Sequence, residues 1–279
     1  MKYFAINAAA LAIIALASCG NKTAPPPSAD TLGTTEISWA DSISANNCTA
    51  KCEIDVMYPT EGGKELLDST REWIAQTLST ITPVDTAATA TAFSSETAAD
   101  GQLLVADAGK RVLEFARGEF ESFSADEGFA FNYEYNAKID KAFASDSVVT
   151  LTSTIYMYNG GAHGGTLANG ATFRTSDGLR LGYDIFEPNS LRELTAMVKY
   201  AVSRQYFETG DDFKMEDALI IDSQEFPLPA VAPYFTEKGL TFIYQQYEIA
   251  CYAAGMPTCT LPYSAVAPLL TPEARTLIP

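Results

Sequence analysis

Residues 129–135, with the sequence FAFNYEY, decide the fold class of this chain. Their aromatic side chains occupy every second position, and alternate residues of a β-strand point to the same face of a sheet. The stretch therefore predicts a strand with one aromatic face packed against a core. Residues 147–158 predict a second, longer strand whose first residues are apolar on both faces. We therefore expect β-structure in the middle of the chain.

Helical patterns flank these strands. Apolar residues recur at helical spacing from residue 61 to 82, from 102 to 123, and from Ser190 onward. Ser190 and Glu193 form a capping box at the start of the third helix. Asp177-Gly178 predicts a tight turn between two short strands. The remaining expected elements are strands at 37–39, 54–58, 171–174, 179–183 and 240–249, and helical turns at 264–270 and 272–276.

These helices and strands occur in clusters, without a steady alternation of strand and helix. That order predicts an α+β fold with antiparallel or mixed sheets and packed helices. A hydrophobic content of 47% excludes a disordered chain. The formal net charge of −17 excludes nucleic acid as a partner and favours cations or basic proteins, although solubility alone also explains such acidity.

The first residues of the chain predict export and lipid attachment. An apolar run of residues 4–16 follows Lys2 and ends in Leu16-Ala17-Ser18-Cys19, a lipobox. We expect residues 1–18 to be a signal peptide and Cys19 to carry acyl chains that hold the protein on a lipid bilayer. An ordinary cleaved signal with an incidental Cys19 is the alternative. The Pro-rich residues 19–35 then form a flexible tether.

The expected location is the cell envelope, on the periplasmic face of the outer membrane. No Asp stands at the second position after the cut, so nothing there indicates retention at the inner membrane. Four more cysteines agree with an oxidising compartment: Cys48, Cys52, Cys251 and Cys259. Four cysteines allow three pairings, of which we expect the local one, Cys48–Cys52 and Cys251–Cys259. The first pair needs a turn between its residues, and without that turn the cysteines pair elsewhere. A zinc site is the alternative, but these spacings do not match it.

A glycine-rich segment surrounds the single histidine of the chain. It contains Gly160, Gly161, His163 and Gly164, directly after Tyr158. Three roles remain open for His163: a hydrogen-bonded side chain that fixes a turn, a ligand-binding group, and a catalytic base. With no second histidine, the spacing predicts no metal site and no cofactor. The alternative activity is a peptidoglycan or glycan hydrolase that uses His163 or a carboxylate pair, for which the acids near apolar strands are Glu134, Asp184, Glu187 and Glu248.

Four motifs carry a resemblance to known families. Residues 158–164 (YNGGAHG), 176–186 (SDGLRLGYDIF), 239–244 (GLTFIY) and 247–255 (YEIACYAAG) resemble, in this order, the RsiV-like C-terminal domain family. The preceding strands and helix resemble its usual partner, the PdaC-like N-terminal domain. The resemblance implies a PdaC-like domain over residues 36–158 and an RsiV-like domain over 159–279. Cys251 departs from the family pattern, which has proline there.

The resemblance implies a binding module rather than an enzyme. Such domain pairs occur in envelope sensors, one branch of which recognises lysozyme, and in lipoproteins of unknown role. We therefore expect a cell-wall glycan fragment or a basic protein such as lysozyme as the ligand. A structural lipoprotein without a small ligand is also compatible with the sequence. The expected binding residues are Tyr158, Gly160, Gly161, His163, Gly164, Asp184, Tyr247 and Glu248.

Overall fold

The computed structural model describes residues 32–81, 92–122, 130–209 and 214–279. The predicted signal peptide, Cys19 and the tether up to residue 31 lie outside these ranges. The first strand already begins at Leu32, inside the range predicted as tether. Within the described ranges, no helix is long and apolar enough to cross a membrane.

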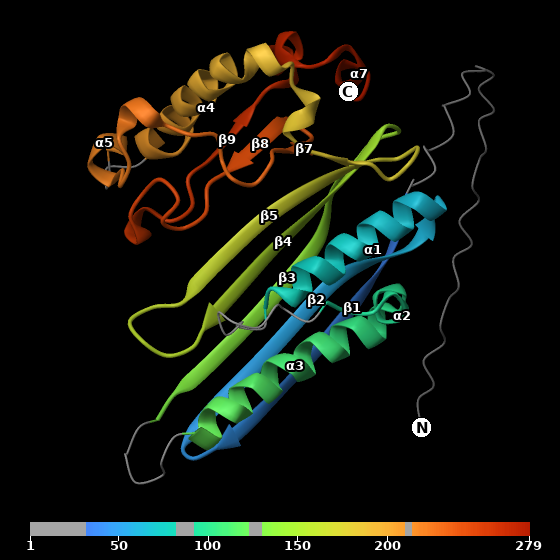
Figure 1. Ribbon diagram of the computed structural model, residues 1–279, viewed down its shortest axis with the longest axis vertical. Helices are drawn as coiled ribbons and strands as arrows, with labels where there is room; N and C mark the ends of the chain where they lie inside the picture. The colour runs from blue at the N-terminus through green and yellow to red at the C-terminus, as the bar shows by residue number, and fades with distance from the viewer. Residues whose placement is uncertain (1–31, 82–91, 123–129, 210–213) are drawn as a thin grey trace, which may run out of the picture.

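A six-stranded mixed sheet forms the larger part of the molecule (Figure 1). Its strands lie side by side in chain order, and only the β2–β3 pair is parallel. The fold is therefore α+β with a mixed sheet, as predicted. The strands are β1 (Leu32–Ala45), β2 (Cys48–Gly62), β3 (Asn132–Ala144), β4 (Val148–Tyr158), β5 (Gly165–Arg174) and β6 (Arg180–Leu181).

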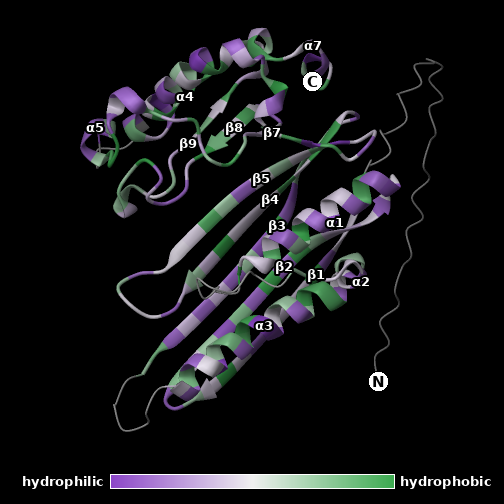
Figure 2. Ribbon diagram, viewed as in Figure 1, coloured by the Kyte–Doolittle hydropathy of each residue, from purple (hydrophilic) through white to green (hydrophobic). Residues whose placement is uncertain are grey.

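Helices α1 (Lys64–Ser79) and α3 (Gly101–Ser122) lie on one face of this sheet, with the short α2 (Ser95–Ala99) between them (Figure 1). The predictions of both long helices are confirmed. Hydrophilic and hydrophobic bands alternate along β2 and β3 (Figure 2), as expected for strands with one buried face. The buried aromatic face of β3 includes Tyr133 and Tyr135, which confirms that part of the predicted strand. Phe131 lies just before β3, and Phe129 lies outside the described residues.

A second, smaller part of the fold packs around an antiparallel sheet of β7 (Tyr234–Thr236), β8 (Gly239–Ile243) and β9 (Thr258–Leu261). Helix α4 (Leu191–Gln205) contacts β9, and α5 (Met215–Ala218), α6 (Tyr263–Val266) and α7 (Pro272–Arg275) complete this part. It has its own buried core. Strands β5 and β6 follow residue 159 in the chain but belong to the six-stranded sheet, and the predicted boundary at 158/159 stays a prediction.

The capping box is absent. Ser190 does not cap α4; its hydroxyl donates to the backbone oxygens of Glu187 (2.7 Å) and Leu269 (3.0 Å) instead. A short 3-10 turn at Pro188–Ser190 precedes α4, so Ser190 already has helical backbone angles and its hydroxyl faces these two carbonyls instead of the first N–H groups of α4.

The expected disulfides are also absent, because all four cysteines of the described residues are free thiols. Cys48 and Cys52 lie on the same continuous strand, β2, where residues four apart are about 13 Å from each other. A disulfide requires Cα atoms within about 7 Å, so the local pair cannot form without breaking the strand. Cys52 and Cys259 are buried, and burial raises the pKa of both thiols to about 12.

Candidate functional site

The glycine-rich segment is the loop that joins β4 to β5. Gly160 and Gly161 have φ angles of 80° and 97°, in the left-handed region that favours glycine. The hydroxyl of Tyr158 donates to the Gly161 carbonyl (3.0 Å) and closes the loop. Gly164 is buried, and a Cβ there would lie 2.5 Å from the Tyr156 ring. The glycines thus allow a tight path that presents His163 on the exposed side of the loop.

A second loop, residues 244–252, binds the open edge of β5 next to this turn. The side-chain amide of Gln245 accepts from the Ala168 N–H (3.1 Å) and donates to the Ala168 carbonyl (2.8 Å). Gln246 accepts from the N–H of Thr166 (2.8 Å). The two glutamines replace a neighbouring strand and satisfy backbone groups of a sheet edge. They also bring the following residue, Tyr247, to His163.

We call His163, Tyr247 and Tyr252 the aromatic cluster. The His163 ring stacks on Tyr252, with centroids 3.8 Å apart and planes at 20°. Its Nε2 lies 3.3 Å from the Tyr247 hydroxyl, and the Tyr252 hydroxyl donates to the Gly164 carbonyl (2.9 Å). The sequence did not predict a role for Tyr252, because only the tertiary fold places it under the histidine.

The tautomer of His163 follows from its partners. Nδ1 lies 3.0 Å from the Gly164 carbonyl oxygen, which can only accept a hydrogen bond. Nδ1 therefore carries the proton in the neutral ring, and Nε2 accepts from the hydroxyl of Tyr247. A backbone carbonyl, not a carboxylate, orients the ring. This arrangement lacks the acid that orients a catalytic histidine in a triad.

Tyr247 is exposed, as is His163, and 54% of the Tyr247 surface is accessible. Its φ angle of 64° is left-handed, which costs a bulky L-residue about 1–2 kcal/mol. Strained residues persist only where their surroundings impose them, and they concentrate at functional sites. The backbone therefore holds an exposed aromatic ring in an unfavourable conformation beside His163.

The two predicted carboxylates do not join the aromatic cluster. Glu248 accepts from the N–H groups of Gln245 and Ala230, both at 2.7 Å, so its two oxygens hold the loops together. Asp184 accepts from the N–H of Gly182 (2.8 Å) and lines a separate groove. Among the described residues, no group of three or more His, Cys, Asp or Glu side chains is placed to hold a metal ion.

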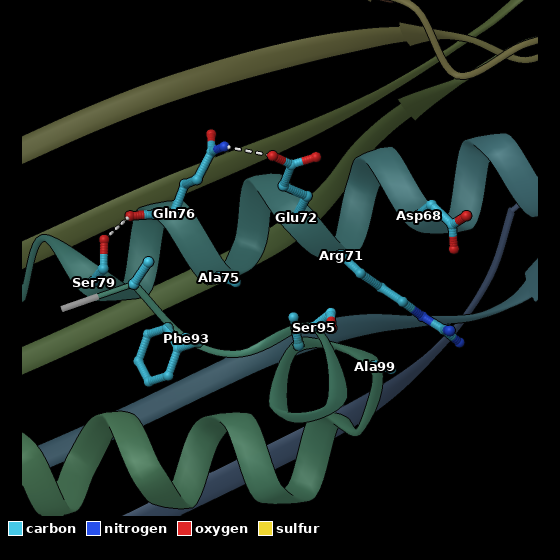
Figure 3. Close-up of a pocket in the computed structure, with 11 residues that line it drawn as sticks. Asp68, Arg71, Glu72, Ala75, Gln76, Ser79, Phe93, Ser95 and Ala99 are labelled. Carbon is cyan, nitrogen blue, oxygen red and sulfur yellow. Dashed lines mark hydrogen bonds between the residues drawn. The ribbon is translucent and has the colours of Figure 1, made fainter.

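A further cavity of about 510 Å³ lies between α1 and the segment that contains α2 (Figure 3). Phe93 and Ala75 contribute apolar surface, and Glu72 accepts a hydrogen bond from Gln76. The Arg71 guanidinium, at the edge of this cavity, donates to the Pro59 carbonyl (3.0 and 3.1 Å). Glu72 and Arg71, two charged residues that line this cavity, thus already have hydrogen-bond partners within the protein.

Comparison with known proteins agrees with this fold. Residues 183–264 match the profile of a family described as "Protein of unknown function (DUF3298)". The matched region includes Asp184, Tyr247, Glu248 and Tyr252, whereas His163 precedes it. No curated protein sequence matches the chain.

Two solved structures are similar over most of the chain. A member of the DUF3298 family from Bacteroides fragilis has a TM-score of 0.68 at 17% identity, covering 87% of this chain and 96% of its own. A DUF3298 family protein from Pseudomonas aeruginosa has a TM-score of 0.54 at 13% identity, covering 86% and 96%. At these identities the likeness establishes a shared fold and no activity.

Proposed function

We propose that this chain is a lipid-anchored, non-enzymatic binding protein of the bacterial cell envelope, and that the aromatic cluster binds a glycan part of a cell-wall fragment. In this proposal Cys19 carries the lipid, and the domain faces the periplasm from the outer membrane. The motifs at 158–164 and 247–255, which resemble the RsiV-like family, meet at the aromatic cluster, with the PdaC-like region before them.

The observation that carries the proposal is the exposed ring of Tyr247 held at a left-handed backbone position against His163. Tyrosine offers an apolar face and a polar hydroxyl, which suits ligands that have both, as sugar rings do. The supporting loops are fixed by hydrogen bonds to β5 and to Gly164, so little entropy is lost when a ligand binds.

A basic protein such as lysozyme is the second candidate ligand. The observation that favours it is the net charge of −17, which would accelerate encounter with a cationic partner. Hydrolysis has less support, because each nitrogen of His163 is paired within the protein and Glu248 is occupied by two backbone N–H groups.

The test is a binding titration of residues 20–279 with solubilised peptidoglycan fragments and, separately, with lysozyme. Replacing Tyr247 by alanine should weaken glycan binding about tenfold, as expected when a central aromatic contact is lost. Tyr200, on α4, is 70% exposed and provides the matched control. A Tyr200→Ala variant should bind like the parent, since Tyr200 lies outside the aromatic cluster.

The salt dependence separates the candidates. Glycan binding should persist at about 0.15 M salt, whereas attraction by net charge alone weakens strongly there. Unchanged binding in Tyr247→Ala would refute the role of the aromatic cluster. Release of glycan products on incubation would overturn the non-enzymatic proposal in favour of the hydrolase.

A further inference from the structure

A groove separate from the aromatic cluster lies between α1 and two other segments, residues 177–184 and 230–232. It consists of two cavities of about 500 and 460 Å³. Trp73 and Arg180 line both of them, so the cavities meet at these two side chains. Each cavity is in the size range of sites that bind small molecules.

Arg180 is a cation without a partner in the groove. No ion pair or hydrogen bond joins its side chain to another residue of the described ranges, whereas neighbouring Arg174 pairs with Asp177 and Glu273. Arg180 is exposed to solvent, and partial desolvation by the surrounding protein lowers the pKa of its guanidinium. A guanidinium in this position gains most from an anion that can accept two parallel hydrogen bonds.

Trp73 and Asn169 supply the other groups that a ligand would contact. Trp73 packs edge-on against Phe173, with centroids 6.5 Å apart, and is only 4% exposed, so its ring is fixed. Neither its indole N–H nor the side-chain amide of Asn169, which lines the second cavity, has a hydrogen-bond partner among the described residues. An unused amide next to an apolar ring suits a ligand that contains a peptide group.

The walls of the groove are held in place by the fold. Gly178, with φ of 69°, lets the β5–β6 turn contact the backbone of α1 at Glu65, and Arg180 follows two residues later. On the other side, Ala230 donates to Glu248 (2.7 Å), and the Tyr183 hydroxyl donates to the Pro229 carbonyl (2.8 Å). The groove is therefore preorganised, which reduces the entropy lost on binding.

The charges in the groove select the kind of anion. Asp184 and Glu72 line it on either side of Arg180, and Asp177 is already paired with Arg174. A phosphate, with about two negative charges near pH 7, would be repelled by these acids, whereas a carboxylate carries one charge. A single guanidinium among acids therefore favours a monoanion.

We infer that this groove binds a short peptide through its free C-terminal carboxylate, with Arg180 holding the carboxylate, Asn169 the peptide group and Trp73 the apolar side chain. Nothing in this inference rests on the glycan-binding role of the aromatic cluster. It assigns a role to the groove in which the sequence-predicted residue Asp184 lies.

The two tryptophans of the chain allow a direct test. The indole N–H signals of ¹⁵N-labelled full chain in detergent micelles are followed by NMR during titration with acetyl-D-Ala-D-Ala and acetyl-L-Ala-L-Ala. A Trp39→Phe variant assigns the two signals. Trp39 lies on β1, at the other end of the strand order from β5 and β6, and serves as an internal reference.

We expect a saturable shift of the Trp73 signal with at least one of the two acetylated dipeptides, and none for Trp39. The corresponding dipeptide amide, which lacks the carboxylate, should bind at least about tenfold more weakly. Arg180→Gln should weaken binding of the acid form by a similar factor, while Arg192→Gln, an exposed arginine of α4, should not.

Several results would overturn the inference: no saturable shift at millimolar dipeptide, equal binding of the acid and the amide, or unchanged binding in Arg180→Gln. An unchanged Trp39 signal in each variant shows that the fold is kept, so a loss of binding is attributable to the groove. Inorganic phosphate serves as the competing anion, and tighter binding of phosphate than of the dipeptide acid would also refute the assignment.

Discussion

Replacing Gly178 by alanine should destabilise the protein by about 3 kcal/mol. The residue has φ of 69°, and a Cβ there would lie 2.7 Å from the carbonyl carbon of Glu65 and closer still to its oxygen. The left-handed conformation costs alanine about 1–2 kcal/mol. Withdrawal of the turn from α1 adds about 1–3 kcal/mol of lost packing. The smaller entropy of the unfolded alanine variant offsets only about 0.4–1 kcal/mol.

Urea unfolding monitored by circular dichroism measures this difference, and Gly118→Ala is the matched control. Gly118 lies in α3, and a Cβ there has nothing within 4 Å. The control should therefore be stabilised by about 0.5–1 kcal/mol, because alanine is the better helix former. If Gly178→Ala unfolds within about 0.5 kcal/mol of the parent, the contact between the β5–β6 turn and α1 does not carry the constraint described above.

Three further predictions concern buried polar groups. The hydroxyl of Tyr135 is buried without a hydrogen-bond partner, so Tyr135→Phe should leave the free energy of unfolding unchanged or raise it by about 1 kcal/mol in the same urea assay. Tyr244→Phe loses a hydrogen bond to the Pro227 carbonyl and should lower the free energy of unfolding by about 1–2 kcal/mol. Burial raises the pKa of the Cys52 and Cys259 thiols from 9.0 to about 12, so the unfolded chain binds fewer protons than the folded one above pH 9. The free energy of unfolding should therefore fall as the pH rises from 9 towards 12. A urea midpoint that stays constant across this window would contradict the raised pKa of the two thiols. At pH 8 a thiol reagent should modify the half-buried Cys251 first and the buried thiols only after unfolding, and a chain that shows no reactive thiols when denatured would instead contain disulfides.

Periodicity was a reliable guide wherever one face of an element is buried. The helical spacing at 61–82 and 102–123 predicted α1 and α3, and the aromatic alternation at 129–135 predicted the buried face of β3. The prediction of a turn at Asp177-Gly178 was also correct, because this signal depends on a positive φ angle, which glycine adopts easily. These signals are local, so tertiary structure did not need to be known.

Strands without a clear buried face were missed or shortened. The prediction for β1 covered only 37–39, whereas the strand extends over Leu32–Ala45. At the sheet edge only two of its residues are buried, so its sequence shows little of the alternation that identifies a strand. The glycine-rich start of β5 resembled a turn, yet Gly170 lies within the strand. A Cβ atom on Gly170 would overlap the Tyr234 ring, so the strand needs a glycine at this position. That close contact comes from a segment more than sixty residues away, which sequence pattern does not reveal.

Only part of the candidate site was predicted, because contacts between segments that are distant in the sequence are again not visible in the sequence pattern. The glycine-rich segment and the segment around Tyr247 were both identified, and the structure brings them together through His163. Tyr252 was not selected, since nothing in its spacing indicates that it stacks on a histidine 89 residues earlier. Asp184 was included because of its position in a motif, but the groove that contains it depends on Trp73, from a distant helix.

The unusual backbone of Tyr247 connects these observations. Three non-glycine residues of the described ranges have positive φ angles, and two of them, Asn46 and Asn47, form the two-residue turn between β1 and β2, where asparagine is well tolerated. Tyr247 is a different case, because a turn of this kind would be more stable with asparagine or glycine.

Its neighbours explain how the conformation is maintained. Gln245 and Gln246 on one side are bound to the edge of β5, and Glu248 on the other is bound to Ala230, a wall of the groove. The chain at Tyr247 is therefore fixed from both sides, and these hydrogen bonds offset the strain. Since a less strained residue would preserve every one of them, the tyrosine contributes something that the fold does not need. An exposed ring next to His163 is what it adds, which is why we place the binding surface there.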